Sequence, residues 1–200
     1  MKELELDEIL KDCWDILDAA ANNRKEPMHT PVLGTVDMDG NPRQRIMVLR
    51  EADKDEAYLR FHTDSRSPKT ADLMHNPSAS VLGYDADRKV QLRMNGIASA
   101  EPHGDMADAA WDASPAYSRR CYMIEKPPGT ILEHVSTGLP EGMEGQKPSE
   151  EDTNAVRENF AIVKFTIQSI DWLFLHHQGN ISARFERAPN GDWTKNWQIP

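Results

Sequence analysis

The amino-acid sequence predicts a mainly β fold of the α+β class, in which peripheral helices surround an antiparallel sheet. Apolar and polar residues alternate with a period of two through most of residues 30–100, and this pattern returns in residues 159–176. The helix expected between the third and fourth strands is one short element, whereas a doubly wound parallel sheet would need repeated crossover helices. We therefore expect an antiparallel sheet, in a single domain over residues 1–200.

The N-terminal segment, residues 1–23, is expected to hold a helix over residues 4–21. Apolar residues recur there at spacings of three and four, which places them on one stripe of a helix. They are Leu6, Ile9, Leu10, Cys13, Ile16, Leu17 and Ala20. Asn22 and Asn23 then interrupt the pattern. The stripe predicts a helix with one buried face.

Five strands are expected in the first half of the chain. The first two form a hairpin, because Asp39-Gly40 supplies turn residues that tolerate a positive φ. A short helix separates the third strand from the fourth, since Ser67 is a good N-cap, Pro68 suits the first helical position and the helix stops at Asn76. The strands are expected over residues 31–37, 43–50, 57–63, 78–84 and 89–100.

The second half begins with a helical stretch over residues 103–124, expected to break at Ser114-Pro115. A long loop follows over residues 134–154, which carry several Gly and Pro and a surplus of acidic residues. Strands are then expected over residues 159–168 and 171–176, and a final hairpin turns at Asn190-Gly191.

Composition and charge limit the function classes. The 200 residues carry a net charge of −10, which disfavours nucleic acid and anionic membranes as partners. There is no apolar run of about 18 residues, the N-terminus does not resemble a secretory signal, and two cysteines make no disulfide framework. We therefore expect a cytoplasmic protein. Basic residues cluster between Arg43 and Lys69 and between Arg88 and Arg93, which favours a pocket for a small anionic ligand.

The clearest site signal lies at the start of the short helix. Thr63, Ser67 and Lys69 converge there with free backbone N–H groups and the positive end of the helix dipole, a combination that binds phosphate. Ordinary helix capping with a solvated lysine is the alternative, and the two are about evenly balanced. Arg45 and Arg50 lie at the two ends of one expected strand. They are five positions apart, so on a regular strand their side chains face opposite sides, and a bulge or twist is needed for both to reach one ligand.

Other polar residues carry weaker signals. Gln91 and Arg93 share a strand face, which is most simply a solvent-exposed row. None of the seven histidines has a zinc-binding spacing, and we expect no metal site. The neighbours His176 and His177 are expected to point to opposite faces of a strand. His62 attracts attention because it precedes Thr63 at a strand end.

Four motifs together resemble the pyridoxamine 5'-phosphate oxidase-like family of FMN-binding split-barrel proteins. The first three are RIMVLR (Arg45 to Arg50), FHTDSRSPK (Phe61 to Lys69) and QLRMNG (Gln91 to Gly96). The fourth, weaker motif is Arg184-Phe185 followed by Trp193 and a terminal Ile199-Pro200. The resemblance implies a six-stranded antiparallel split β-barrel that holds FMN across a homodimer interface.

The resemblance also implies roles for individual residues. Arg45, Ser67 and Lys69 are similar to the family's grip on the FMN phosphate, and His62 and Thr63 to a pair that contacts the flavin. Gln91 and Arg184 are similar to contacts supplied by the second subunit. The wall along the flavin is implied for Arg50 and for the main-chain groups of Ile46, Met47, Val48 and Leu49.

The chain also departs from the family pattern. Pro68 replaces an arginine beside the phosphate, and Asn180 and Ser182 stand where the B6 oxidases carry an arginine and a histidine. The tryptophan expected on the flavin falls between Phe174 and His176 without a firm assignment. We therefore expect an FMN-dependent oxidoreductase acting on an unidentified small molecule, with no catalytic side chain assigned. Two alternatives stay open: an FMN carrier or sensor without turnover, and a haem-handling split-barrel protein.

Overall fold

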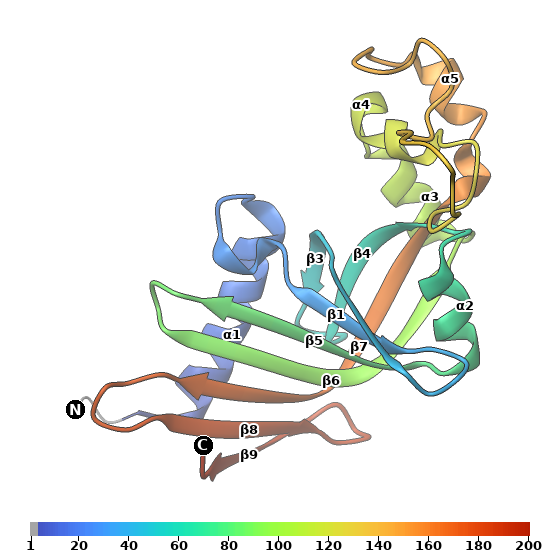
Figure 1. Cartoon of the computed structure of the whole chain (residues 1–200). Coiled ribbons are helices and arrows are strands. Elements are labelled where there is room, and N and C mark those ends of the chain that lie inside the picture. Colours follow the sequence, from blue (N-terminus) through green and yellow to red (C-terminus); the bar gives the residue numbers. More distant parts are fainter. Residues whose placement is uncertain (1–3) are drawn as a thin grey trace.

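A computed structural model describes residues 4–200, and its nine strands within those residues form one antiparallel sheet (Figure 1). The order is β2-β1-β5-β6-β7-β4-β3, and β8 and β9 extend from β7. The sheet curls into a split-barrel-like fold because β7 pairs along one side with both β4 and β8 and along the other with β6. The strands are β1 (Val32–Val36), β2 (Pro42–Ile46), β3 (Leu49–Asp53), β4 (Tyr58–Asp64), β5 (Ser78–Asp85), β6 (Val90–Glu101), β7 (Phe160–Phe174), β8 (Ile181–Arg187) and β9 (Trp193–Gln198).

The antiparallel prediction is confirmed, with two differences in the strands. The expected strand over residues 43–50 is two strands, because the chain leaves the ladder at Met47 and Val48, and Met47 instead donates its N–H to the carbonyl of Pro31 at 2.9 Å. The expected strands over residues 159–168 and 171–176 are one fifteen-residue strand, β7. Ser169 does not break β7, since it is buried and paired on both sides.

A close approach of two backbones explains the glycine in QLRMNG. The pairing of β6 with β7 shifts register between Asn95 and Gly96, which marks a β-bulge. A Cβ atom at Gly96 would lie 2.0 Å from the carbonyl oxygen of Thr166, closer than any real contact. Only glycine fits this position without moving β7.

Helix α1 (Leu6–Asn22) carries the predicted apolar stripe and packs against β3 and β9. Its residues Cys13 and Leu17 belong to the main core together with Leu49, Phe165 and Phe185, all of them at most 1% exposed. Residues 1–3 of the expected N-terminal helical segment lie outside the described residues. Among residues 4–200, no helix has both the length and the apolar character that crossing a bilayer requires.

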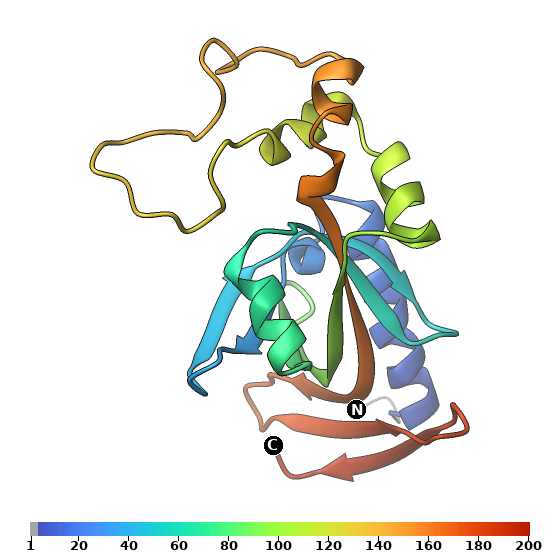
Figure 2. The ribbon, with the colours of Figure 1, turned by 90° about the vertical axis from the view of Figure 1, so that its right-hand side faces the viewer.

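Apart from η1, which lies beside α1 and β5, the remaining helices gather at one end of the sheet (Figures 1 and 2). The predicted break at Ser114-Pro115 is confirmed, and the last five residues of the loop expected over 134–154 form a helix that starts in a capping box at Ser149. A second, smaller core joins these helices to β7 through Trp111, Tyr122 and Phe160. The helices are η1 (Pro27–His29), α2 (Pro68–His75), α3 (Asp105–Asp112), α4 (Ala116–Arg119), η2 (Arg120–Tyr122), α5 (Glu150–Asn154) and η3 (Arg157–Asn159).

Candidate functional site

The predicted phosphate motif forms a cluster where β4 leads into α2. Pro68 opens the helix, as expected, and Ser67 occupies the N-cap position. The Ser67 side chain makes no capping bond, however. It accepts a hydrogen bond from Lys69 Nζ at 2.9 Å, and Lys69 Nζ also donates to Thr63 Oγ1 at 2.9 Å. Two buried hydroxyls therefore hold the ammonium group at the N-terminus of α2.

Arg45 is fixed beside this cluster by residues that the sequence did not single out. Its Nη1 donates to Thr35 Oγ1 at 2.7 Å, and its Nη2 lies 3.9 Å from Oδ2 of Asp72. Asp72 is a buried residue of α2 and accepts a hydrogen bond from Thr35 at 3.4 Å. The guanidinium is thus tied to both β1 and α2.

The electrostatics of the cluster fit an anion. Burial lowers the pKa of Lys69, and the charge of Arg45 lowers it further. Burial also lowers the pKa of Arg45, and the carboxylate of Asp72 opposes that shift. A bound phosphate would relieve the repulsion between the two cations and would meet the positive end of α2. The donor set therefore suits the phosphate of a nucleotide-like cofactor.

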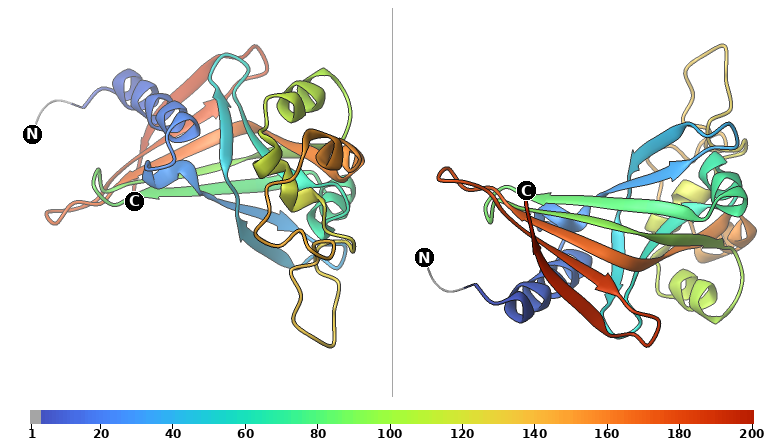
Figure 3. Two further views of the ribbon diagram at one scale, coloured as in Figure 1. Left: turned by 90° about the horizontal axis from the view of Figure 1, so that it is seen from above. Right: turned by 90° about the horizontal axis from the view of Figure 1, so that it is seen from below.

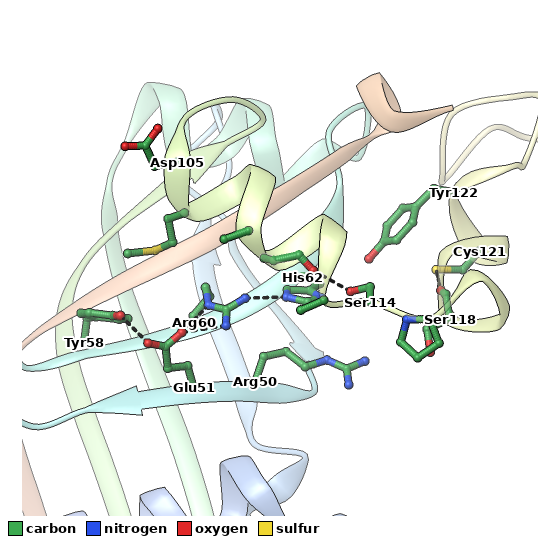
Figure 4. A pocket seen from close by; sticks show the side chains of 15 residues that line it. Arg50, Glu51, Tyr58, Arg60, His62, Asp105, Ser114, Ser118, Cys121 and Tyr122 are labelled. Carbon is green, nitrogen blue, oxygen red and sulfur yellow. Dashed lines mark hydrogen bonds and ion pairs between the residues drawn. The ribbon is translucent and has the colours of Figure 1, made fainter. Parts of the chain in front are cut away.

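A cavity of about 610 Å³ lies between the β3–β4 hairpin and the helical end of the molecule (Figure 4), and none of the four residues of the cluster lines it. His62 and Arg50 belong to its wall, which links the cavity to the two site motifs. The opposite wall is made by α3 and the turn after it, with several alanines. The lining is Arg50, Glu51, Tyr58, Arg60, His62, Asp105, Met106, Ala109, Ala110, Ala113, Ser114, Pro115, Ser118, Cys121 and Tyr122.

The strand wall of the cavity carries a chain of polar contacts. Tyr58 donates to Glu51 Oε1 at 2.6 Å, and Arg60 Nε donates to Glu51 Oε2 at 2.7 Å. Arg60 Nη1 then donates to His62 Nε2 at 2.8 Å (Figure 4). Because arginine has no acceptor, His62 must accept through Nε2, so its own proton is at Nδ1.

Burial and two nearby positive charges set the protonation state of His62. Burial lowers its pKa to about 3, and the nearby charges of Arg60 and Arg50 contribute to the shift. The imidazole is therefore neutral at physiological pH. Sequence analysis identified His62 but missed Arg60, although the two residues lie two positions apart and share a face of β4.

The segment between β2 and β3 presents two kinds of residue. Met47 and Leu49 are buried in the core, so only their backbone groups are available to a ligand. Ile46 is 69% exposed and Arg50 lines the cavity. Arg45 and Arg50 lie on different strands, β2 and β3, so the alternation of side chains along one strand does not set their relative directions.

Gln91 and Arg184 do not approach the phosphate cluster within one chain. Thr63 pairs with Ala161 near the start of β7, whereas Arg184 pairs with Asp171, ten residues further along the same strand. That separation corresponds to about 33 Å of strand. One chain therefore keeps these two groups of predicted site residues apart.

Asp171 links Arg184 to Arg93. Its Oδ1 accepts from Arg184 at 3.1 Å and its Oδ2 accepts from Arg93 at 2.8 Å. Glu186 also accepts a hydrogen bond from Arg184, at 3.0 Å. Arg93 is 57% exposed, as a solvent-facing row implies, and it also forms an ion pair across β6 and β7.

The expected placement of the histidine pair is wrong. Strand β7 ends at Phe174, and the turn that follows brings the rings of His176 and His177 to a centroid distance of 4.3 Å. Phe174 packs against the main core and has the opposite parity to Asp171. The face of β7 that carries the Arg184 contact thus does not carry Phe174.

Comparison with known sequences finds similarity over the first half of the chain. Residues 12–101 match the family model of the FMN-binding domain of pyridoxamine 5'-phosphate oxidase. Pyridoxine/pyridoxamine 5'-phosphate oxidase 2 of Arabidopsis thaliana is 29% identical over 102 residues, 48% of this chain and 52% of that protein. The corresponding oxidase of Burkholderia mallei is 38% identical over 87 residues, 42% of this chain and 38% of that protein. The matches thus span about half or less of these relatives.

Crystal structures of two proteins share the fold over the whole chain. A pyridoxamine 5'-phosphate oxidase-related, FMN-binding protein from Nostoc punctiforme superposes with a TM-score of 0.74 at 21% identity, covering 100% of both chains. PhzG from Burkholderia lata, in complex with tetrahydrophenazine-1-carboxylic acid, superposes with a TM-score of 0.70 at 17% identity, covering 100% of this chain and 94% of that one.

The chain has a split-barrel fold, and its residues 12–101 are similar to an FMN-binding domain. The matched segment is a little under half of this chain, and the domain that it resembles is described as FMN-binding.

Proposed function

We propose that this chain is an FMN-dependent oxidoreductase of the cytoplasm that acts on a small molecule, with residues 1–200 forming one FMN-binding domain. The observation that carries the proposal is the cation pair of Arg45 and Lys69 at the N-terminus of α2. Lys69 is held by Thr63, and the preceding residue of β4, His62, lines a cavity. FMN, when bound, supplies the hydride and electron chemistry. The protein binds the cofactor, orients it and shapes the space for a substrate.

The proposed cofactor site runs from the phosphate cluster towards the cavity. Lys69, Ser67 and Arg45 hold the phosphate, and Thr63 supports Lys69 through its hydroxyl. The backbone of residues 46–49 and the side chains of Arg50 and His62 line the flavin. His62 is neutral, so it offers an Nδ1–H donor and no charge. The rest of the cavity, with its alanine-rich wall, receives the substrate.

A second copy of the chain completes the site in this proposal. Cross-strand pairs place Ile46, Val32, Leu82, Arg93, Asp171 and Arg184 in one continuous row on one face of the sheet. The β2–β5 end of that row is apolar and open, with Ile46 at 69% and Leu82 at 39% exposure. A homodimer formed through this face would bring Gln91 and Arg184 of one chain towards the phosphate cluster of the other.

The test begins with the absorption spectrum and the sedimentation behaviour of the purified protein. We expect a flavin spectrum, release of FMN and not FAD, and a dimer that FMN tightens by linkage. Reduction by NAD(P)H followed by repeated turnover with an acceptor supports an oxidoreductase. Stable FMN binding without turnover across donors and acceptors supports the carrier or sensor instead, and failure to bind added FMN contradicts both.

A further inference from the structure

Residues 124–148, between η2 and α5, form a long loop that we call the arm. Its base is anchored at both ends. Arg66 donates to the carbonyl of Ile124 at 3.0 Å, and Arg120 donates to the carbonyl of Gln146 at 3.0 Å. Within the arm, the Glu125 N–H donates to the carbonyl of Gly138 at 2.8 Å. The arm is therefore a loop of defined shape, closed near its base.

The tip of the arm, residues 130–137, presents apolar side chains to solvent. Ile131 is 95% exposed, Val135 is fully exposed and Leu132 is 43% exposed. Three large aliphatic residues within five positions form a local apolar surface. Exposed apolar groups that cluster in this way mark an interaction site in a soluble protein.

The position of the arm indicates what the tip contacts. Gly129 lies against Pro68, the first residue of α2, so the arm passes directly over the proposed phosphate site before it projects. Figures 2 and 3 show the tip reaching out on the side of the sheet away from α1. The open face with Ile46 and Leu82 is turned to this same side, since the opposite face of those strands packs on α1 and the core.

We propose that the arm is a dimerisation arm, whose apolar tip packs on a second copy of this chain beside the FMN phosphate site. The inference rests on the proposed function, because the cofactor site there is incomplete without a second copy. A copy seated on the open face would meet the tip, and two-fold symmetry would bury two tips in one dimer. The arm would thereby tie subunit association to the edge of the cofactor site.

The test uses the full-length protein loaded with FMN and the double variant I131S/V135S. Each removed aliphatic side chain contributes to burial at the interface, so we expect the dimer dissociation constant to rise about 100-fold or more in sedimentation equilibrium. The matched control is E133S/H134S, which changes two exposed residues of the same tip and keeps its apolar groups. The control should dimerise as the unchanged protein does.

A second measurement follows the arm itself. Backbone amides of residues 130–137 should exchange with deuterium more slowly at protein concentrations that favour the dimer. The inference is overturned if the dimer dissociation constant of I131S/V135S equals that of the unchanged protein, or if deuterium exchange at the tip does not depend on protein concentration. Either result leaves FMN binding intact. A protein that dimerises through the tip but never binds FMN contradicts the proposed function and not the arm.

Discussion

Arg60 donates a hydrogen bond to Nε2 of His62 at 2.8 Å, and this contact fixes the tautomer of the histidine, while burial is the main reason that the imidazole is uncharged. Arg60 is itself held by Glu51, so its guanidinium stays next to the imidazole. Histidine commonly titrates near neutral pH, but His62 stays uncharged and forms part of the cavity wall.

The first prediction is that His62 does not titrate between pH 5 and 8. Its pKa in the folded protein is about 3, below the ordinary value of 6.5, so the unfolded chain takes up a proton first as the pH falls. The stabilisation is complete above pH 6.5 and is lost progressively towards pH 3, by up to about 1.4 kcal/mol per pH unit. NMR titration of the imidazole signals measures this directly.

Two variants make the cause of this shift testable. Arg60→Met should raise the pKa of His62 more than Arg50→Met does, because Arg60 is the larger of the two charge effects. A midpoint for His62 near pH 6.5 in the unaltered protein would contradict the assigned contact.

The second prediction concerns the phosphate cluster. Lys69→Ala and Arg45→Ala should each weaken FMN far more than riboflavin, because riboflavin has no phosphate. A charge-assisted contact contributes about 1.5–3 kcal/mol, or roughly 10- to 150-fold in affinity. Flavin fluorescence titration measures both ligands. Lys54→Ala, at an exposed turn, is the control, and equal losses for FMN and riboflavin would remove these residues from the phosphate.

The third prediction is poor oxidation of pyridoxamine 5'-phosphate and pyridoxine 5'-phosphate. Ser182 is buried, donates to the carbonyl of Trp172 at 2.9 Å and accepts from Gln198 at 2.9 Å, so its hydroxyl is already engaged. Asn180 is neutral. Without the two charged contacts of the B6 oxidases, the specificity constant should be about two to four orders of magnitude lower than theirs. Pyridoxal phosphate formation by FMN-loaded protein is the assay, and turnover at the level of those oxidases would refute the alignment of Asn180 and Ser182.

The fourth prediction is that Gly96→Ala destabilises the fold. Its Cβ would overlap the carbonyl oxygen of Thr166, so β6 and β7 must separate at the bulge. Overpacking of this kind costs about 1–3 kcal/mol or more, which urea unfolding resolves. Ser99→Ala, on the same strand at an exposed position, should change stability little.

Local signals made the sheet and the phosphate cluster predictable. Ser67, Pro68 and Lys69 are contiguous, and capping preferences act over a few residues, so their helix start could be read from the sequence. The break after Ile46 could not, because Met47 and Val48 are apolar and fit a strand pattern equally well. Their departure from the ladder depends on the contact with Pro31.

The supporting residues of the site depend on tertiary register. Asp72 and Thr35 reach Arg45 only because β1 and α2 pack together, and Glu51 meets Arg60 through the pairing of β3 with β4. Similarly, Asp171 joins Arg93 to Arg184 across three strands. Single-sequence patterns show the face on which a residue lies, but not the partner that the fold brings to it.

The ten residues of β7 that separate the two groups of predicted site residues have a genetic consequence in the proposed dimer. A chain defective at Lys69 and a chain defective at Arg184 would each be inactive alone. Produced together, they would form mixed dimers in which one cofactor site receives both damaged halves and the other receives both sound ones. The mixed dimers would bind FMN at one of their two sites, although neither parent protein is active alone. This intragenic complementation could not occur if each site were contained within one chain.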